Sequence, residues 1–138
     1  MLKAVNDGNV SRIIDIGCGY GTQLLSLSRT LQATGQDVEL HGIDMTYSRV
    51  ACANILHKQH NRDQVPTFSA SDARYLPYPD DYFDLGYSIY VFEVMPTAVL
   101  QHAMLETLRV CKKVVFLEPL KDVQSAFGQI YYRLFDLG

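Results

Sequence analysis

The chain has 138 residues, of which 48% are hydrophobic and 20% are charged, and its formal net charge is −3 at pH 7. These values describe an ordinary globular chain with a single core, and they exclude a general electrostatic attraction to nucleic acid or anionic membranes. No apolar run reaches the roughly 18 residues that a membrane-spanning helix needs, so we expect no membrane partner. The three cysteines lack paired spacing and favour a reducing, cytoplasmic location over a disulfide framework.

Predicted strands and helices alternate along the chain. Apolar runs predict strands at residues 12–16, 38–44, 67–71, 84–89 and 113–118. Helical spacing of apolar residues predicts helices at residues 22–34, 47–59 and 97–109. Several strands are apolar at successive positions, such as Ile13 and Ile14, which is typical of parallel strands covered on both faces. The alternation therefore predicts an α/β fold, a doubly wound parallel sheet with helices on both faces.

The loop between the first predicted strand and the first predicted helix reads DIGCGYG over residues 15–21. It departs from the G-x-G-x-x-G pattern of dinucleotide-binding loops, because Thr22 stands where the third glycine belongs. A helix N-terminus attracts a pyrophosphate, but the carboxylate of Asp15 would repel it. The same carboxylate would attract an ammonium group. S-adenosylmethionine carries an amino-acid end and a sulfonium cation but no phosphate, so the loop favours this cofactor.

With this loop, the chain resembles the class I S-adenosylmethionine-dependent methyltransferases. The order of its motifs is similar to the small-molecule, methyltransferase type 11-like branch, and the resemblance extends over residues 12–119. It implies a Rossmann-like parallel sheet of about five strands in the order 3-2-1-4-5. It also implies that the loop wraps the methionine part of the cofactor, with Gly17 and Gly19 closest, Cys18 between them and Asp15 directed toward the amino group.

Asp44 stands at the end of the second predicted strand. An acid at this place can accept hydrogen bonds from both hydroxyls of a ribose. An aspartate at a strand end often caps the following helix instead, but Thr46 or Ser48 can supply that cap and leave Asp44 free. We therefore assign Asp44 to the ribose and Met45 to apolar packing against the adenine.

The segment after the third predicted strand contains Asp72 and Ala73. The resemblance implies that the Asp72 carboxylate accepts from the exocyclic amine of adenine and that the Ala73 N–H donates to a ring nitrogen. The alternative is an Asx-turn, in which the Asp72 side chain accepts from a nearby backbone N–H. The two interpretations are compatible, because such a turn can also hold the loop in place.

The end of the fourth predicted strand and the segment after it bear on the methyl group and the acceptor. The resemblance assigns Ser88 to the cofactor site. Tyr87, Tyr90 and Glu93 are candidates for a direct role in catalysis, although a structural role also explains each of them. A histidine often follows the glutamate in the family, and here that position is Val94, so no general base is assigned. The absence of an Asn/Asp-Pro-Pro-aromatic segment argues against a nucleobase amine or a glutamine side chain as the acceptor.

Two histidines, His57 and His60, are three residues apart near a predicted helix end, a spacing that could hold a metal. No third ligand accompanies them in the sequence. We therefore interpret them as part of a solvated helix end, and no metal site is expected.

The end of the chain has apolar residues at helical spacing, which predicts a helix that covers the sheet. These residues are Phe127, Ile130, Tyr131, Leu134 and Phe135. Family members usually continue beyond the fifth strand with a helix and a further pair of strands, and this final strand pair is not expected here. The fifth strand would then be an exposed edge unless the tail or another subunit covers it, so we expect self-association through that edge.

The predicted function is S-adenosylmethionine-dependent methyl transfer to a small-molecule acceptor. We expect residues 1–138 to form one core domain, truncated at both ends relative to the family. Two alternatives stay open. The first is a non-catalytic cofactor-binding module, or a subunit whose acceptor site a partner completes. The second is a nicotinamide-dependent oxidoreductase with an unusual loop.

Overall fold

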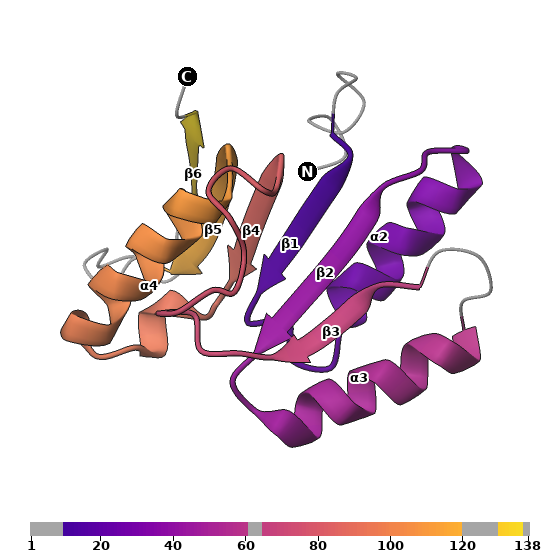
Figure 1. Cartoon of the computed structure of the whole chain (residues 1–138), viewed down its shortest axis with the longest axis horizontal. Coiled ribbons are helices and arrows are strands. Elements are labelled where there is room, and N and C mark those ends of the chain that lie inside the picture. The colour runs from indigo at the N-terminus through magenta and orange to yellow at the C-terminus, as the bar shows by residue number, and fades with distance from the viewer. Residues whose placement is uncertain (1–9, 61–64, 120–129, 137–138) are drawn as a thin grey trace.

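The computed structural model describes residues 10–60, 65–119 and 130–136, which form a six-stranded sheet in the order β3-β2-β1-β4-β5-β6 (Figure 1). The strands are β1 (Arg12–Ile16), β2 (Glu39–Asp44), β3 (Thr67–Ala70), β4 (Leu85–Ile89), β5 (Lys113–Pro119) and β6 (Ile130–Asp136). The helices are α2 (Thr22–Ala33), α3 (Tyr47–His60), α4 (Thr97–Val110) and the 3-10 turn η1 (Phe92–Val94). The α/β architecture predicted from the alternation of apolar runs is confirmed.

The first five strands are parallel and follow the predicted order 3-2-1-4-5. β1 pairs with β2 on one side, where Ile14 lies opposite His41, and with β4 on the other, where Ile14 lies opposite Gly86. The chain therefore builds β2 and β3 on one side of β1 and then crosses to build β4 and β5 on the other. The loops after β1 and β4 diverge at this switch point, and ligands of such sheets bind in the crevice at the carboxyl ends of the strands.

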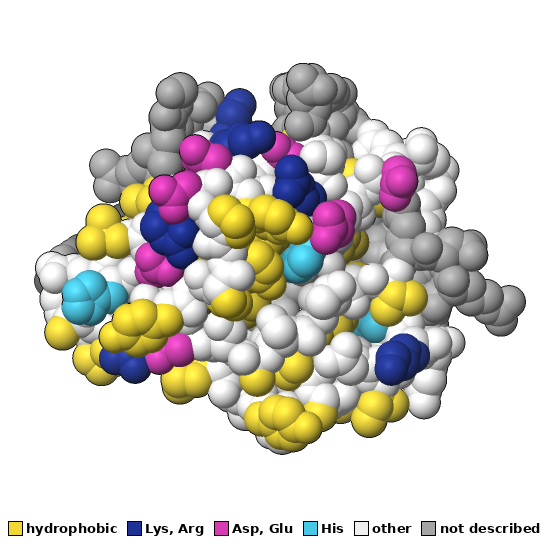
Figure 2. Space-filling model, in the orientation of Figure 1, with side chains coloured by type: hydrophobic (Ala, Val, Ile, Leu, Met, Phe, Trp, Pro, Cys, Tyr) yellow, Lys and Arg dark blue, Asp and Glu magenta, His cyan; other side chains and the backbone are white. Residues whose placement is uncertain are grey.

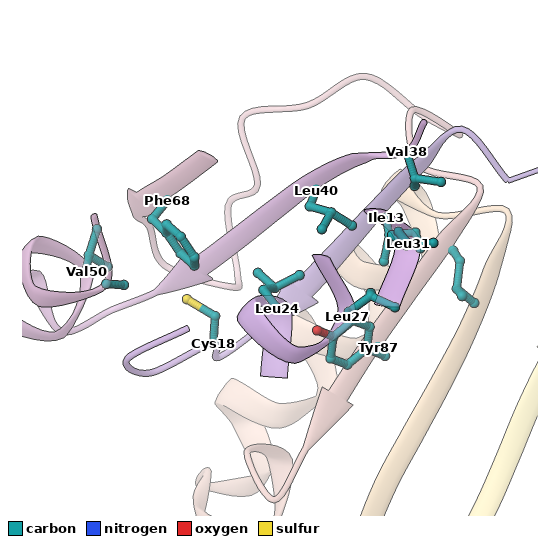
Figure 3. Close-up of a cluster of buried hydrophobic side chains, with 12 residues drawn as sticks. Ile13, Cys18, Leu24, Leu27, Leu31, Val38, Leu40, Val50, Phe68 and Tyr87 are labelled. Atoms are coloured by element: carbon teal, nitrogen blue, oxygen red, sulfur yellow. The ribbon is translucent and has the colours of Figure 1, made fainter. Parts of the chain in front are cut away.

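Two apolar layers cover the faces of the sheet. On one face, Ile13 packs with Leu24 of α2 and Val50 of α3 (Figure 3). On the other face, Ile14 packs with Val110 of α4. Successive residues of β1 thus serve opposite layers, and each fully buried aliphatic side chain contributes about 1.5–3 kcal/mol to stability. Within the described ranges, no helix is both long and apolar enough to cross a bilayer.

Residues 130–136 form a strand where the apolar spacing predicted a helix, so that prediction is wrong for this segment. β6 runs antiparallel to β5 and pairs with it from Lys113 opposite Asp136 to Pro119 opposite Ile130. Phe127, which belonged to the same prediction, lies outside the described residues. A short apolar run is compatible with both a helix and a strand. The otherwise unpaired backbone groups of β5 favour a strand beside them.

The sheet consequently has one antiparallel strand beyond the five parallel strands that were predicted. β5 is not an exposed edge, because β6 pairs with it over all seven of its residues. The self-association expected through a free β5 edge stays a prediction, and the structure removes the free edge on which it was based.

Candidate functional site

A cavity of about 440 Å³ opens at the carboxyl ends of β1, β2 and β3, beside η1 and the start of α4. The predicted cofactor residues that line it are Gly17, Asp44, Met45, Asp72 and Ala73. Apolar side chains form much of the remaining wall, from Ile16, Ile43, Val91, Val94, Met95, Pro96, Val99 and Ala103. The tertiary structure thus brings the loop after β1 and the segments after β2 and β3 to one place, as the sequence predicted.

The glycine loop is held against β2 by backbone hydrogen bonds. The N–H groups of Gly17 and Cys18 both donate to the carbonyl oxygen of Ile43, each at 2.8 Å. Gly17 has φ +79°, a left-handed conformation that side chains disfavour, and a Cβ added there would lie 2.4 Å from a methyl carbon of Val91. Any larger residue at position 17 would therefore push Val91 away and change the cavity wall.

Asp44 is buried at the end of β2, and both of its carboxylate oxygens accept hydrogen bonds. Oδ2 accepts from the N–H of Gly19 at 3.0 Å, and Oδ1 accepts from the N–H of Thr46 at 2.8 Å. The expectation that Asp44 would be left free is therefore wrong, because its own side chain ties the glycine loop to the start of α3. A carboxylate offers about four lone-pair sites, so each oxygen can still accept one further hydrogen bond from the cavity.

Asp15 is buried on the α2 side of β1, behind the cavity rather than in its lining. Burial raises the pKa of its carboxyl to about 7, with a smaller opposing effect from Tyr87 and a smaller raising effect from the charge of Asp44. The hydroxyl of Tyr87 interacts with Asp15 electrostatically but makes no hydrogen bond of good geometry. Cys18 is also buried, and burial raises the pKa of its thiol to about 12. A nearby cation would favour the ionised form of Asp15.

Asp72 forms the Asx-turn that was the alternative to adenine binding. Its Oδ1 accepts from the backbone N–H of Arg74 at 2.9 Å, and its Oδ2 accepts from Nη2 of the same residue at 2.7 Å. These hydrogen bonds with Arg74 lower the pKa of the Asp72 carboxyl. The turn holds the segment in place, so that both Asp72 and Ala73 line the cavity.

The candidates from the fourth strand lie outside the cavity lining. Tyr87 is buried beside Leu27 in the layer under α2 (Figure 3). Ser88 is fully buried, with its Oγ 3.5 Å from Oε1 of Glu118. Tyr90 is 46% exposed and has φ +57°, whereas Glu93 is half-buried in η1. The structure therefore brings none of these four residues into the wall of the cavity.

Glu118 is a residue of this region that the sequence reasoning missed. It lies in β5, and its carboxylate accepts hydrogen bonds from three successive backbone N–H groups of the segment after β4. The available signal was an acid at the carboxyl end of a predicted parallel strand, the same signal that singled out Asp44 on β2.

His57 is fully buried, so the interpretation of a solvated helix end is wrong for this residue. Its Nε2 lies 2.9 Å from the carbonyl oxygen of Gly21, and its ring packs on Phe68 with 4.5 Å between centroids. The side chain of His60 lies outside what the structure describes. A ring N–H of His57 can donate to Gly21, which joins α3 to the start of α2.

The sequence matches the family described as "Methyltransferase domain" over residues 13–114, a range that includes the glycine loop, Asp44, Asp72 and α4. The chain belongs to the class I S-adenosylmethionine-dependent methyltransferases. S-adenosylmethionine is the cofactor of this family. The strand order and the cavity at the switch point agree with this membership.

This methyltransferase domain is 34% identical over 85 residues to 27-O-demethylrifamycin SV methyltransferase of Amycolatopsis mediterranei, covering 62% of this chain and 29% of that protein. It is 27% identical over 126 residues to 2-phytyl-1,4-naphtoquinone methyltransferase of Synechococcus elongatus, covering 87% of this chain and 52% of that protein. The crystal structure of the cyclase SpnF has a TM-score of 0.73 and 30% identity, covering 86% of this chain and 42% of that one. The domain thus spans about half or less of the length of each of these relatives.

Proposed function

We propose that this chain binds S-adenosylmethionine in the cavity and transfers its methyl group to a small-molecule acceptor. The observation that carries the proposal is the position of Asp44, whose carboxylate reaches both the glycine loop and the cavity. The volume of about 440 Å³ lies within the usual range for small-molecule sites. The mixture of one acidic strand end and a largely apolar wall also fits a nucleoside with an attached amino acid.

The proposed assignments follow the lining of the cavity. Asp44 would accept from the ribose hydroxyls, and Met45 would cover the adenine. Asp72 and Ala73 would meet the polar edge of the adenine, and Gly17 would let the backbone approach the methionine part. The bound cofactor would supply a methyl group already activated by the sulfonium.

Gly19, Asp15, Cys18 and Ser88 would act from behind the wall. Gly19 would hold the loop through its hydrogen bond to Asp44. Asp15 would contribute negative charge toward the cofactor's amino group, and its pKa of about 7 shows that this charge is costly without a cation beside it. Cys18 and Ser88, both buried, would shape the loop and the end of β4 rather than touch the cofactor.

The chain's own contribution to methyl transfer would be to hold donor and acceptor in line and to exclude water. Tyr90 and Glu93 remain the proposed candidates for contact with the acceptor, since both flank Val91 and Val94 of the wall. Met45 and Val94 are 77% and 76% exposed. Separate apolar side chains are also exposed along the lower edge of the molecule in Figure 2, where Figure 1 places α3. These surfaces support an acceptor with substantial apolar area.

We further propose that residues 1–138 act as one cofactor-binding core and that other segments or a partner complete the acceptor site. The names of the two methyltransferase relatives, whose lengths the chain only partly spans, support an organic small-molecule acceptor. A cytoplasmic location is proposed from the free thiols of Cys18, Cys52 and Cys111. The alternative of a non-catalytic binding module makes the same cofactor prediction and differs only in turnover.

The test is calorimetric titration of the chain with S-adenosylhomocysteine and, separately, with NAD. We expect S-adenosylhomocysteine to bind and NAD not to bind. Asp44→Ala should weaken binding by about 1–3 kcal/mol, the cost of hydrogen bonds lost from a charged group. The matched control is Asp37→Ala, an exposed aspartate before the amino end of β2, which should bind as the wild type does.

Because Asp44 also ties Gly19 to Thr46, circular dichroism must show that the variant is folded. Asp44→Asn, which keeps one acceptor oxygen, should bind with intermediate affinity. Binding of NAD without S-adenosylhomocysteine would overturn the proposal, as would unchanged affinity in Asp44→Ala. Transfer of a labelled methyl group to components of a cell extract separates the enzyme from the non-catalytic module.

A further inference from the structure

The segment after β4 forms one wall of the cavity and begins with a strained residue. Tyr90 has φ +57°, a left-handed conformation that is unusual for a bulky side chain. Val91 and Val94, which follow it, line the cavity. Such a conformation persists only where the surroundings hold it, so the contacts of this segment must be strong enough to fix it.

The carboxylate of Glu118 provides those contacts from the neighbouring strand β5. Its Oε1 accepts from the N–H groups of Val91 and Phe92, both at 3.2 Å, and its Oε2 accepts from the N–H of Glu93 at 3.1 Å. The N–H of Tyr90 donates to the carbonyl oxygen of Leu117 at 2.9 Å. The first N–H groups of a helical turn have no partner within the turn, and a carboxylate is a strong acceptor for them.

The same segment touches the glycine loop directly. A Cβ built on Gly17 would lie 2.4 and 2.7 Å from the two methyl carbons of Val91, so the Val91 side chain fills the space that the glycine leaves open. A shift of the segment after β4 would therefore move both the wall of the cavity and the neighbour of the loop.

We propose that Glu118 is a positioning residue, which fixes the segment 91–94 against the glycine loop and thereby sets the affinity for the cofactor. The affinity part of this inference rests on the proposed function. The geometric part does not, because the three hydrogen bonds exist whatever ligand enters the cavity. Glu118 acts through Val91 and Val94 and itself lies outside the lining.

The two carboxylate oxygens allow a graded test. Glu118→Gln keeps one carbonyl oxygen, which can still accept from Val91 and Phe92, but its amide NH₂ would face the N–H of Glu93. Glu118→Ala removes both acceptor oxygens and with them all three hydrogen bonds. The matched control is Glu39→Gln at the amino end of β2, where the Glu39 carboxylate contacts the His41 ring away from the cavity lining.

The experiment measures the dissociation constant of S-adenosylhomocysteine by calorimetry on the full 138-residue chain and its variants. We expect Glu118→Ala to weaken binding about tenfold or more, Glu118→Gln to weaken it less, and Glu39→Gln to match the wild type. Amide hydrogen exchange is measured on the same samples. Exchange at residues 91–93 should accelerate in Glu118→Ala more than exchange in β1, because the hydrogen bonds lost are local.

Each outcome separates the two proposals. If the wild type does not bind S-adenosylhomocysteine, the proposed function fails, and exchange at residues 91–93 alone decides whether Glu118 fixes the segment. If the wild type binds S-adenosylhomocysteine and both Glu118 variants bind it as tightly as the wild type does, the inference is overturned. Uniformly faster exchange across the sheet would show a general loss of stability and would also overturn it. Should Glu118→Ala not fold, the same two readouts on Glu118→Gln carry the test.

Discussion

At the scale of single residues, three acids at the carboxyl ends of parallel strands have three different environments. Asp44 accepts two backbone N–H groups and reaches the cavity. Glu118 accepts hydrogen bonds from three backbone N–H groups and orders the segment after β4. Asp15 is buried, and burial dominates its titration. The sequence could predict that acids stand at these ends, but hydrogen-bond donors from distant segments determine what each acid does.

Asp15 should make the stability of the unliganded chain depend on pH. Its pKa is raised from 3.8 to about 7, so between these values the native state binds more protons than the unfolded state. The free energy of unfolding should therefore fall as pH rises from about 4 to about 7, by on the order of 4 kcal/mol, and level off above. Urea denaturation at pH 5 and pH 8 measures the part of this change that falls above pH 5, about 3 kcal/mol.

The control for that measurement is Asp15→Asn, which cannot ionise and should show a smaller loss of stability between the two pH values. Other groups titrate equally in both proteins, so the difference between wild type and variant isolates Asp15. Equal losses in the two proteins would contradict the raised pKa.

At the scale of elements, α4 holds the segment after β3 through Arg109. The guanidinium donates to the carbonyl oxygens of Leu76 at 3.0 Å and Tyr78 at 2.9 Å, and it pairs with Glu106 at 2.7 Å. Glu106 in turn accepts from the N–H of Leu76 at 2.9 Å. These contacts fix the far end of the segment that carries Asp72 into the cavity.

Replacing Arg109 should therefore affect both stability and binding. We expect Arg109→Ala to lower the free energy of unfolding by about 1–3 kcal/mol, mainly through the lost hydrogen bonds to the carbonyl oxygens of Leu76 and Tyr78. The exposed contact with Asp80 contributes little. Arg109→Lys should recover only part of the lost free energy of unfolding, since a single ammonium cannot reproduce the planar, forked donors of a guanidinium. Thermal denaturation measures the change, with Arg29→Ala on the exposed face of α2 as the control. If Arg29→Ala lowered the free energy of unfolding as much as Arg109→Ala, this role for Arg109 would be contradicted.

At the scale of the whole molecule, the sheet places its cavity where the chain switches from one side of β1 to the other. The alternation of apolar runs and right-handed crossovers predicted a doubly wound α/β sheet, and the resemblance to the methyltransferase family implied the order of its five parallel strands. The strand β6 could not be predicted in this way, because its conformation depends on pairing with β5 and not on its own residues. The added strand also changes which backbone groups are available at the edge of the sheet.

A chain that ends at Pro119 should self-associate more than the 138-residue chain, because β5 would then present its unpaired N–H and C=O groups. Light scattering over a range of concentrations measures the average mass of both chains. A control that keeps β6 but carries Glu39→Gln should behave as the full chain does. Equal masses for the truncated and full chains would show that β6 does not protect this edge.

The sequence by itself determined the α/β fold, the glycine loop after the first strand and the two acids, Asp44 and Asp72, that line the cavity, and its resemblance to a family implied the order of five strands. These features depend on local patterns and on strand ends that meet at one edge of a parallel sheet. Only the tertiary structure decided that Tyr87 and His57 are buried, that Asp44 is hydrogen-bonded, that Glu118 orders the cavity wall and that the tail pairs as a strand. Each of these depends on contacts between segments far apart in the chain, which no local pattern of residues specifies.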